Sequence, residues 1–111
     1  MKENLTRLRA EHRKLQRRLG EVGRISCGTV QDRGPGAGGP CYQWTRKERR
    51  KTVSVALSKE QYEQMRAAIG NWRELQQALK RMEQISRTLI FETTPGPSRR
   101  KPLTKKVLGL I

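Results

Sequence analysis

The sequence predicts an α+β protein in which two amphipathic helices flank a small three-stranded antiparallel meander. Three observations favour this class: leucines at a 3-4 spacing over residues 2–22, two alternating segments within 41–57, and a long apolar stripe at helical spacing over 59–91. Only 33% of the 111 residues are hydrophobic, so the core must be thin. We expect one domain over residues 1–91 and a basic, flexible tail over 92–111.

The first predicted helix, residues 2–22, carries a narrow leucine seam of the coiled-coil kind. Gly20 and Gly23 are expected to end it. His12 falls on the seam, where it is either a pH switch or ligand, or a polar seam residue that fixes helix register. Its position favours the second role. The apolar seam residues are Leu5, Leu8, Leu15, Leu19 and Val22.

A loop with four Gly and two Pro over residues 31–40 lies between one predicted strand and two others. Residues 24–30 predict a short strand before the loop. Residues 41–46 and 51–57 alternate in polarity, which is typical of two further strands joined as a hairpin. The three segments together predict the meander.

The hairpin has a register that we can test against its side chains. A loop over 47–50 places Trp44 opposite Val53 and Tyr42 opposite Val55, so one face is apolar and the other polar. This separation is the pattern that a genuine antiparallel pair should produce.

The second predicted helix spans residues 59–91. Ser58 and Gln61 have the spacing of a capping box at its start. Gly70, in the middle, costs about 1 kcal/mol relative to Ala. The apolar spacing is slightly under 3.6 residues, which suits a helix that packs on the sheet with its first half and antiparallel to the first helix with its second. The stripe consists of Tyr62, Met65, Ile69, Trp72, Leu75, Leu79, Met82, Ile85 and Leu89.

The charge balance is the strongest functional signal. The chain has 25 Lys or Arg against 10 Asp or Glu, a net charge of +15. Such an excess on a short chain favours a polyanionic partner, DNA or RNA above an acidic membrane surface or an acidic protein. No apolar run approaches the roughly 20 residues that span a bilayer, and the N-terminus lacks the apolar segment of a signal peptide. We therefore expect no membrane association and a cytoplasmic location.

The sequence contains few residues that could support catalysis or bind a metal ion. One His and two Cys do not supply a four-ligand zinc site, and Cys27 and Cys41 match no zinc-finger spacing. The glycine-rich loop lacks the lysine and the following helix of a phosphate-binding loop. We expect no enzyme activity, no metal and no cofactor.

The candidate phosphate contacts fall in three basic segments. The densest folded segment is the hairpin tip, followed by the polar face of the first helix and then the tail. In the expected architecture the first two lie on one continuous surface. The residues are Arg46, Lys47, Arg49, Arg50 and Lys51 at the tip, Arg13, Arg17 and Arg18 on the helix, and Arg99, Arg100 and Lys101 in the tail.

Two aromatic residues beside the tip have alternative roles. Tyr42 and Trp44 are either base-stacking platforms in a basic surround or the contribution of the sheet to the core. Their positions opposite valines favour the core. Trp72 is likewise expected in the core.

The stretch from about Gly23 to Leu89 resembles a family of small bacterial and archaeal proteins of unknown function. The shared motifs are Cys27-Gly28, the run from Gly39 to Lys47, Lys51-Thr52-Val53, and Leu57-Ser58-Lys59-Glu60-Gln61. The resemblance implies a small zinc-binding protein encoded near transposases and other mobile elements. This chain lacks the additional loop cysteines of that pattern, and Cys41 replaces an aromatic residue.

The sequence thus favours a non-enzymatic accessory protein that binds the phosphate backbone of a nucleic acid, as a subunit of a larger nucleoprotein complex. The alternative is a coiled-coil adaptor or homodimer that binds an acidic protein partner. Phosphate binding weakens steeply with salt, which separates the two hypotheses.

Overall fold

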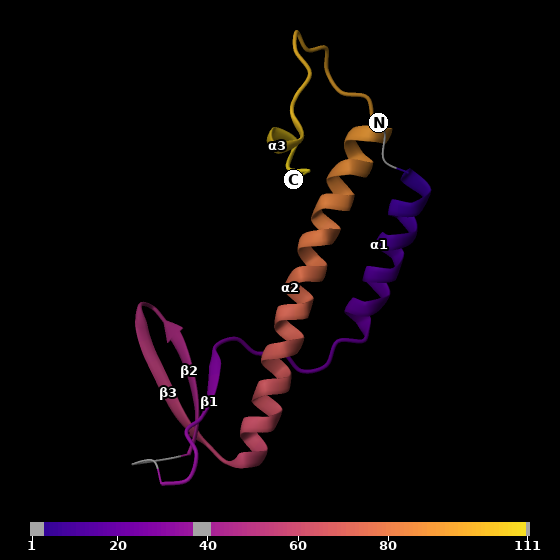
Figure 1. The fold of residues 1–111 in the computed structure, drawn as a ribbon. Coiled ribbons are helices and arrows are strands. Elements are labelled where there is room, and N and C mark those ends of the chain that lie inside the picture. The colour runs from indigo at the N-terminus through magenta and orange to yellow at the C-terminus, as the bar shows by residue number, and fades with distance from the viewer. Residues whose placement is uncertain (1–3, 37–40, 111) are drawn as a thin grey trace. The chain divides into compact units, whose positions relative to one another are not determined.

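The computed structural model describes residues 4–36 and 41–110 and confirms the α+β class (Figure 1). The chain forms two compact units, and helix α2 (Lys59–Thr93) contributes to both. The described residues of 1–21 and 76–111 make the first unit. Residues 22–75 make the second. The division into one domain over 1–91 and a tail stays a prediction.

In the first unit, helix α1 (Leu5–Gly20) and the second half of α2 run side by side in opposite directions (Figure 1). The predicted bounds of 2–22 were too wide, because Asn4 is extended and its side chain accepts a hydrogen bond from the Arg7 amide. At the other end the Glu21 amide donates to the Arg18 carbonyl. The buried cluster between the helices consists of Leu8, Leu15, Ala78 and Ile85, with Leu5, Met82 and Leu89 packed around it.

In the second unit, three antiparallel strands form a sheet in the order β1-β2-β3: β1 (Thr29–Asp32), β2 (Tyr42–Glu48) and β3 (Lys51–Leu57). The predicted strand over 24–30 was placed too early. The Ser26 amide donates to the carbonyl of Ala68 in α2, and Asn71 donates to the carbonyl of Arg24. Because α2 takes these backbone groups, strand pairing begins only at Thr29.

The hairpin register differs from the predicted one by two residues. Trp44 pairs with Val55 and Tyr42 with Leu57, so the turn is Arg49-Arg50 alone. A shift of two preserves which side chains share a face, so the predicted apolar and polar faces survive the correction.

Helix α2 begins with the predicted capping box. The Ser58 amide donates to Gln61 Oε1 at 3.0 Å, and the Gln61 amide donates to Ser58 Oγ at 3.1 Å. In the part of the chain that the structure describes, no helix is long and apolar enough to cross a membrane.

The predicted flexible tail contains a short helix, α3 (Lys105–Leu108). Thr104 caps its start, and Gly109 ends it in the left-handed conformation. Arg87 of α2 donates to the Gly109 carbonyl at 3.1 Å, and Leu108 is half-buried. Ile111 lies outside the described residues.

Candidate nucleic-acid interface

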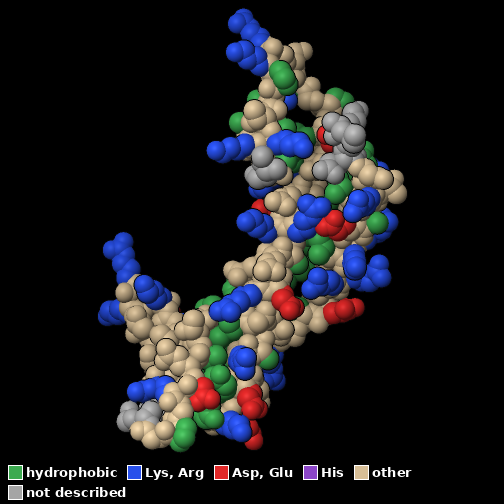
Figure 2. Space-filling model, in the orientation of Figure 1, with side chains coloured by type: hydrophobic (Ala, Val, Ile, Leu, Met, Phe, Trp, Pro, Cys, Tyr) green, Lys and Arg blue, Asp and Glu red, His purple; other side chains and the backbone are tan. Residues whose placement is uncertain are grey.

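The hairpin tip presents four exposed cations, which we name the tip cluster: Lys47, Arg49, Arg50 and Lys51. Figure 2 shows Lys and Arg side chains gathered at the end of the hairpin. None of the four forms an ion pair with any described residue, so all four ammonium and guanidinium groups are available to an external anion.

The turn holds both of its arginines in an unfavourable backbone conformation. Arg49 has φ 48° and Arg50 has φ 68°. A two-residue hairpin turn of the primed type requires positive φ at both positions, for which Asn-Gly is preferred. An L-residue other than Gly loses roughly 1–2 kcal/mol there. The chain therefore places two long cations where neutral, smaller residues would make a more stable turn.

Alternation along the strands spreads the tip cluster over both faces of the hairpin. Lys47 lies opposite Thr52 in the strand register on one face, and Lys51 lies opposite Glu48 on the other. Arg49 and Arg50 lie at the end. The hairpin tip is thus cationic on both faces and at its end.

Arg46, also predicted as a phosphate contact, is already engaged. Its guanidinium lies 4.5 Å from the Trp44 ring centroid and forms an ion pair with Glu48 at 3.0 Å. The side chain is 28% exposed, so Arg46 is less accessible than the tip cluster. It neutralises the one carboxylate of the hairpin.

Tyr42 and Trp44 are both half-buried and make contacts within the second unit. The Trp44 indole donates to the Cys27 carbonyl at 2.9 Å. The Tyr42 ring lies 4.9 Å from that of Tyr62, between centroids. These contacts agree with a structural role for both rings. Trp72, expected in the core, is also half-buried.

The other two predicted patches belong to the first unit. Arg13, Arg17 and Arg18 are exposed on α1, and Arg99, Arg100 and Lys101 are exposed after α2. Because the hairpin belongs to the second unit, the expected continuous surface from α1 to the tip stays a prediction.

The two cysteines are free and lie apart along the sheet. Cys27 precedes Gly28, which lies against Thr45: a Cβ built on Gly28 would be 2.5 Å from the Thr45 carbonyl oxygen. Cys41 is four residues away from Thr45 along the chain. Four strand residues span about 13 Å, well beyond the roughly 7 Å limit for a disulfide. Within residues 4–36 and 41–110, no three His, Cys, Asp or Glu side chains form a metal-binding group. His12 is half-buried on α1.

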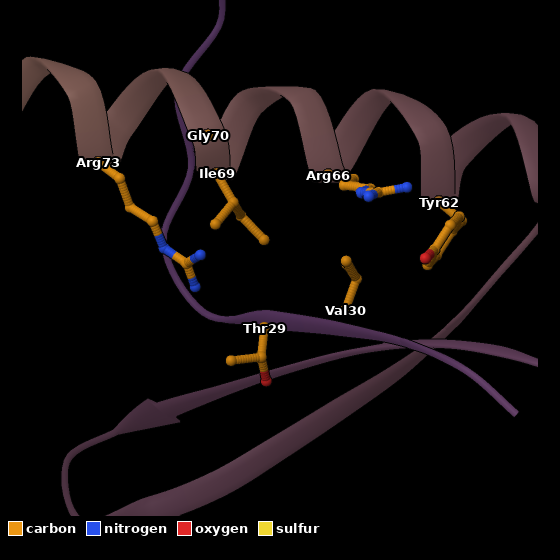
Figure 3. Close-up of a pocket in the computed structure, with 7 residues that line it drawn as sticks. All are labelled: Thr29, Val30, Tyr62, Arg66, Ile69, Gly70 and Arg73. Carbon is orange, nitrogen blue, oxygen red and sulfur yellow. The ribbon is translucent and has the colours of Figure 1, made fainter.

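A second basic feature of the sheet unit, which was not predicted from the sequence, is an open groove of about 410 Å³ between β1 and the first half of α2 (Figure 3). Arg66 and Arg73 flank Gly70 along one side of this groove. Their spacing of seven residues around a central glycine was the signal in the sequence. The groove is lined by Thr29, Val30, Tyr62, Arg66, Ile69, Gly70 and Arg73.

Comparisons with known proteins add no relative. No protein-family model, curated protein or solved structure matches this chain. The geometry and charge of the two basic features therefore carry the functional information.

Proposed function

We propose that this protein is a non-enzymatic, cytoplasmic nucleic-acid-binding factor whose hairpin tip contacts the phosphate backbone. The observation that carries the proposal is the pair of arginines at positive φ, Arg49 and Arg50. A turn that served only to reverse the chain would gain stability from Asn-Gly. Backbone strain of this kind is typical of positions where function, not stability, decides the residue.

The distribution of charge supports a backbone contact. A two-stranded ribbon fits the major groove of a duplex, where phosphates lie on both sides of it. The tip cluster has Lys47 on one face, Lys51 on the other and two arginines at the end. Contacts of this kind fix position on the duplex and carry no base sequence, so we expect little sequence preference.

The coiled-coil adaptor has less support. Leu8 and Leu15 of the α1 seam are only 6% and 9% exposed, because α2 of the same chain covers them. A seam that is already packed offers little to a second helix. We also propose that this nucleic-acid-binding protein acts as a subunit of a larger nucleoprotein complex.

To test this proposal, Arg49 and Arg50 are replaced by Asn-Gly, the pair that a two-residue turn of this type prefers. In the double variant Arg49→Asn, Arg50→Gly, we expect the free energy of unfolding to rise by about 1–2 kcal/mol, because the positive-φ strain is relieved. Affinity for a 20-base-pair duplex should fall roughly tenfold, about 1.4 kcal/mol. The log–log salt slope should become shallower by about 0.9 for each phosphate that the variant no longer neutralises.

A charge-matched control separates the turn from net charge. Lys59 and Lys80 are exposed on α2, and the double variant Lys59→Gln, Lys80→Gln removes the same two charges. We expect it to change duplex affinity far less. A turn variant with unchanged affinity and salt slope would reduce the tip to a solvated turn. A wild-type protein that binds no nucleic acid at low salt would leave the acidic-protein adaptor as the better hypothesis.

A further inference from the structure

The groove beside β1 contains two arginines on one face of α2. Arg66 and Arg73 are separated by two helical turns, about 10 Å along the axis. In Figure 3 the guanidinium of Arg73 extends from the helix toward Thr29, and that of Arg66 extends along the helix toward Tyr62. The two cations therefore line the same side of one open space.

Neither arginine has an acidic partner among the described residues. Both are exposed, and no described carboxylate forms an ion pair with Arg66 or Arg73. By contrast, the arginines at positions 46, 81 and 87 each pair with a glutamate. The groove thus keeps a concentrated positive charge that the described part of the fold leaves unneutralised.

Gly70 lies between the two arginines and supplies an independent observation. Glycine inside a helix destabilises it relative to alanine, so packing usually accounts for its presence. Here a Cβ built on Gly70 meets no atom of the described residues within 4 Å, and its φ is not in the left-handed region. Neither packing nor backbone conformation requires a glycine. A missing side chain that opens the groove does allow a ligand to approach the helix closely.

We propose that this groove binds an unpaired segment of a nucleic-acid strand, with its phosphates at Arg66 and Arg73 and its backbone passing over Gly70. This inference rests on the proposed function and adds a second contact with a different substrate form. A groove of about 410 Å³ is in the size range of sites for small ligands. It admits one or two nucleotides of a single strand, whereas a duplex is too wide. The tip cluster and the groove would together recognise a nucleic acid with both paired and unpaired parts.

The experiment compares three substrates with the same protein preparations. Fluorescently labelled oligo-dT and oligo-rU of 12 nucleotides report the groove, and a 20-base-pair duplex reports the tip. In the variant Arg66→Gln, Arg73→Gln, affinity for the single strands should fall about tenfold, and the salt slope should become shallower by about 0.7 for each phosphate released from the groove. Duplex affinity should change less than threefold.

Gly70→Ala makes the test independent of charge and of misfolding. It should raise the melting temperature, because alanine favours the helix, and still weaken single-strand binding, because its methyl group lies where the strand passes over the helix. The charge-matched control Lys59→Gln, Lys80→Gln should bind both substrates almost as wild type does. Lower affinity in a more stable protein excludes unfolding as the cause.

The outcomes separate this proposal from the one on which it rests. If wild type binds duplex and the turn variant weakens it, but both groove variants bind single strands as wild type does, the groove proposal alone is overturned. If wild type binds neither the duplex nor the single strands at low salt, both proposals fail. Equal losses for duplex and single strand in the variant Arg66→Gln, Arg73→Gln would also overturn it, because the two arginines would then act only through net charge.

Discussion

The indole nitrogen of Trp44 lies 2.9 Å from the carbonyl oxygen of Cys27 and donates a hydrogen bond to it. The bond joins the start of the sheet to its central strand, just before Gly28 turns the chain at φ 97°. A Cβ on Gly28 would lie 2.7 Å from the same indole nitrogen and 2.5 Å from the Thr45 carbonyl oxygen. Glycine is therefore needed at position 28 for this close approach, whereas Cys27 contributes only its backbone carbonyl.

Gly28→Ala should destabilise the protein strongly, by about 2–4 kcal/mol, since backbone strain and a steric clash with backbone atoms act together. Urea unfolding monitored by tryptophan fluorescence measures this. Gly36→Ala is the matched control: its φ is 83°, but among the residues that the structure describes no atom lies within 4 Å of a Cβ built there. We expect it to cost about 1 kcal/mol, the strain alone. Equal destabilisation of the two variants would show that the close approach to Trp44 is unimportant.

The ion pair between Glu11 and Arg81 gives the first unit a pH dependence. Arg81 Nε donates to Glu11 Oε2 at 2.6 Å, and this hydrogen bond is the main reason that the pKa of Glu11 lies below its ordinary value of 4.5. A lowered folded pKa means that the pair stabilises the fold above about pH 4.5 and that this contribution is lost as the pH falls through the lowered value.

We therefore expect Glu11→Gln to unfold more easily than wild type at pH 7, by no more than about 1 kcal/mol because both side chains are partly exposed. The difference should shrink below pH 4.5 and in 1 M salt. Thermal unfolding at pH 7 and pH 3 measures it, with Glu63→Gln, an exposed glutamate of α2, as control. A difference that grows on acidification would contradict the assigned role of the pair.

Trp72 is half-buried, so its truncation should cost less than that of a fully buried tryptophan. We expect Trp72→Ala to destabilise by about 2 kcal/mol, below the roughly 3–5 kcal/mol of a core position. Nucleic-acid affinity measured below the unfolding transition should be unchanged. Leu79→Ala, at a position that is 40% exposed, should cost clearly less. An unaltered melting temperature with weaker binding would instead identify Trp72 as a ligand contact.

The separation of Cys27 and Cys41 bears on the zinc site that the resemblance to the small zinc-binding family implies. Gly28, next to Cys27, lies against Thr45, and about 13 Å of strand separates Thr45 from Cys41, so we do not expect one ion to bind both thiols of a chain. We expect elemental analysis of the purified protein to find no stoichiometric zinc. About one zinc per chain, absent from the variant Cys27→Ser, would overturn this prediction and restore the implied site.

Sequence alone determined the features that depend on neighbouring residues. The capping box of Ser58 and Gln61 and the face that each strand residue occupies follow from local spacing, and the structure confirms both. The basic hairpin tip was also evident from sequence, since the four cations of the tip cluster lie within the five consecutive residues 47–51.

Tertiary structure decided what depends on distant partners. A two-residue register shift leaves every side chain on its predicted face, so alternation alone did not reveal that Arg49 and Arg50 form the whole turn. The segment around Ser26 is not a strand because Ala68 of α2 takes its amide, and these residues are far apart in sequence. The groove has the same origin: helical spacing aligned Arg66 and Arg73, but only packing against β1 gave them a shared space to face.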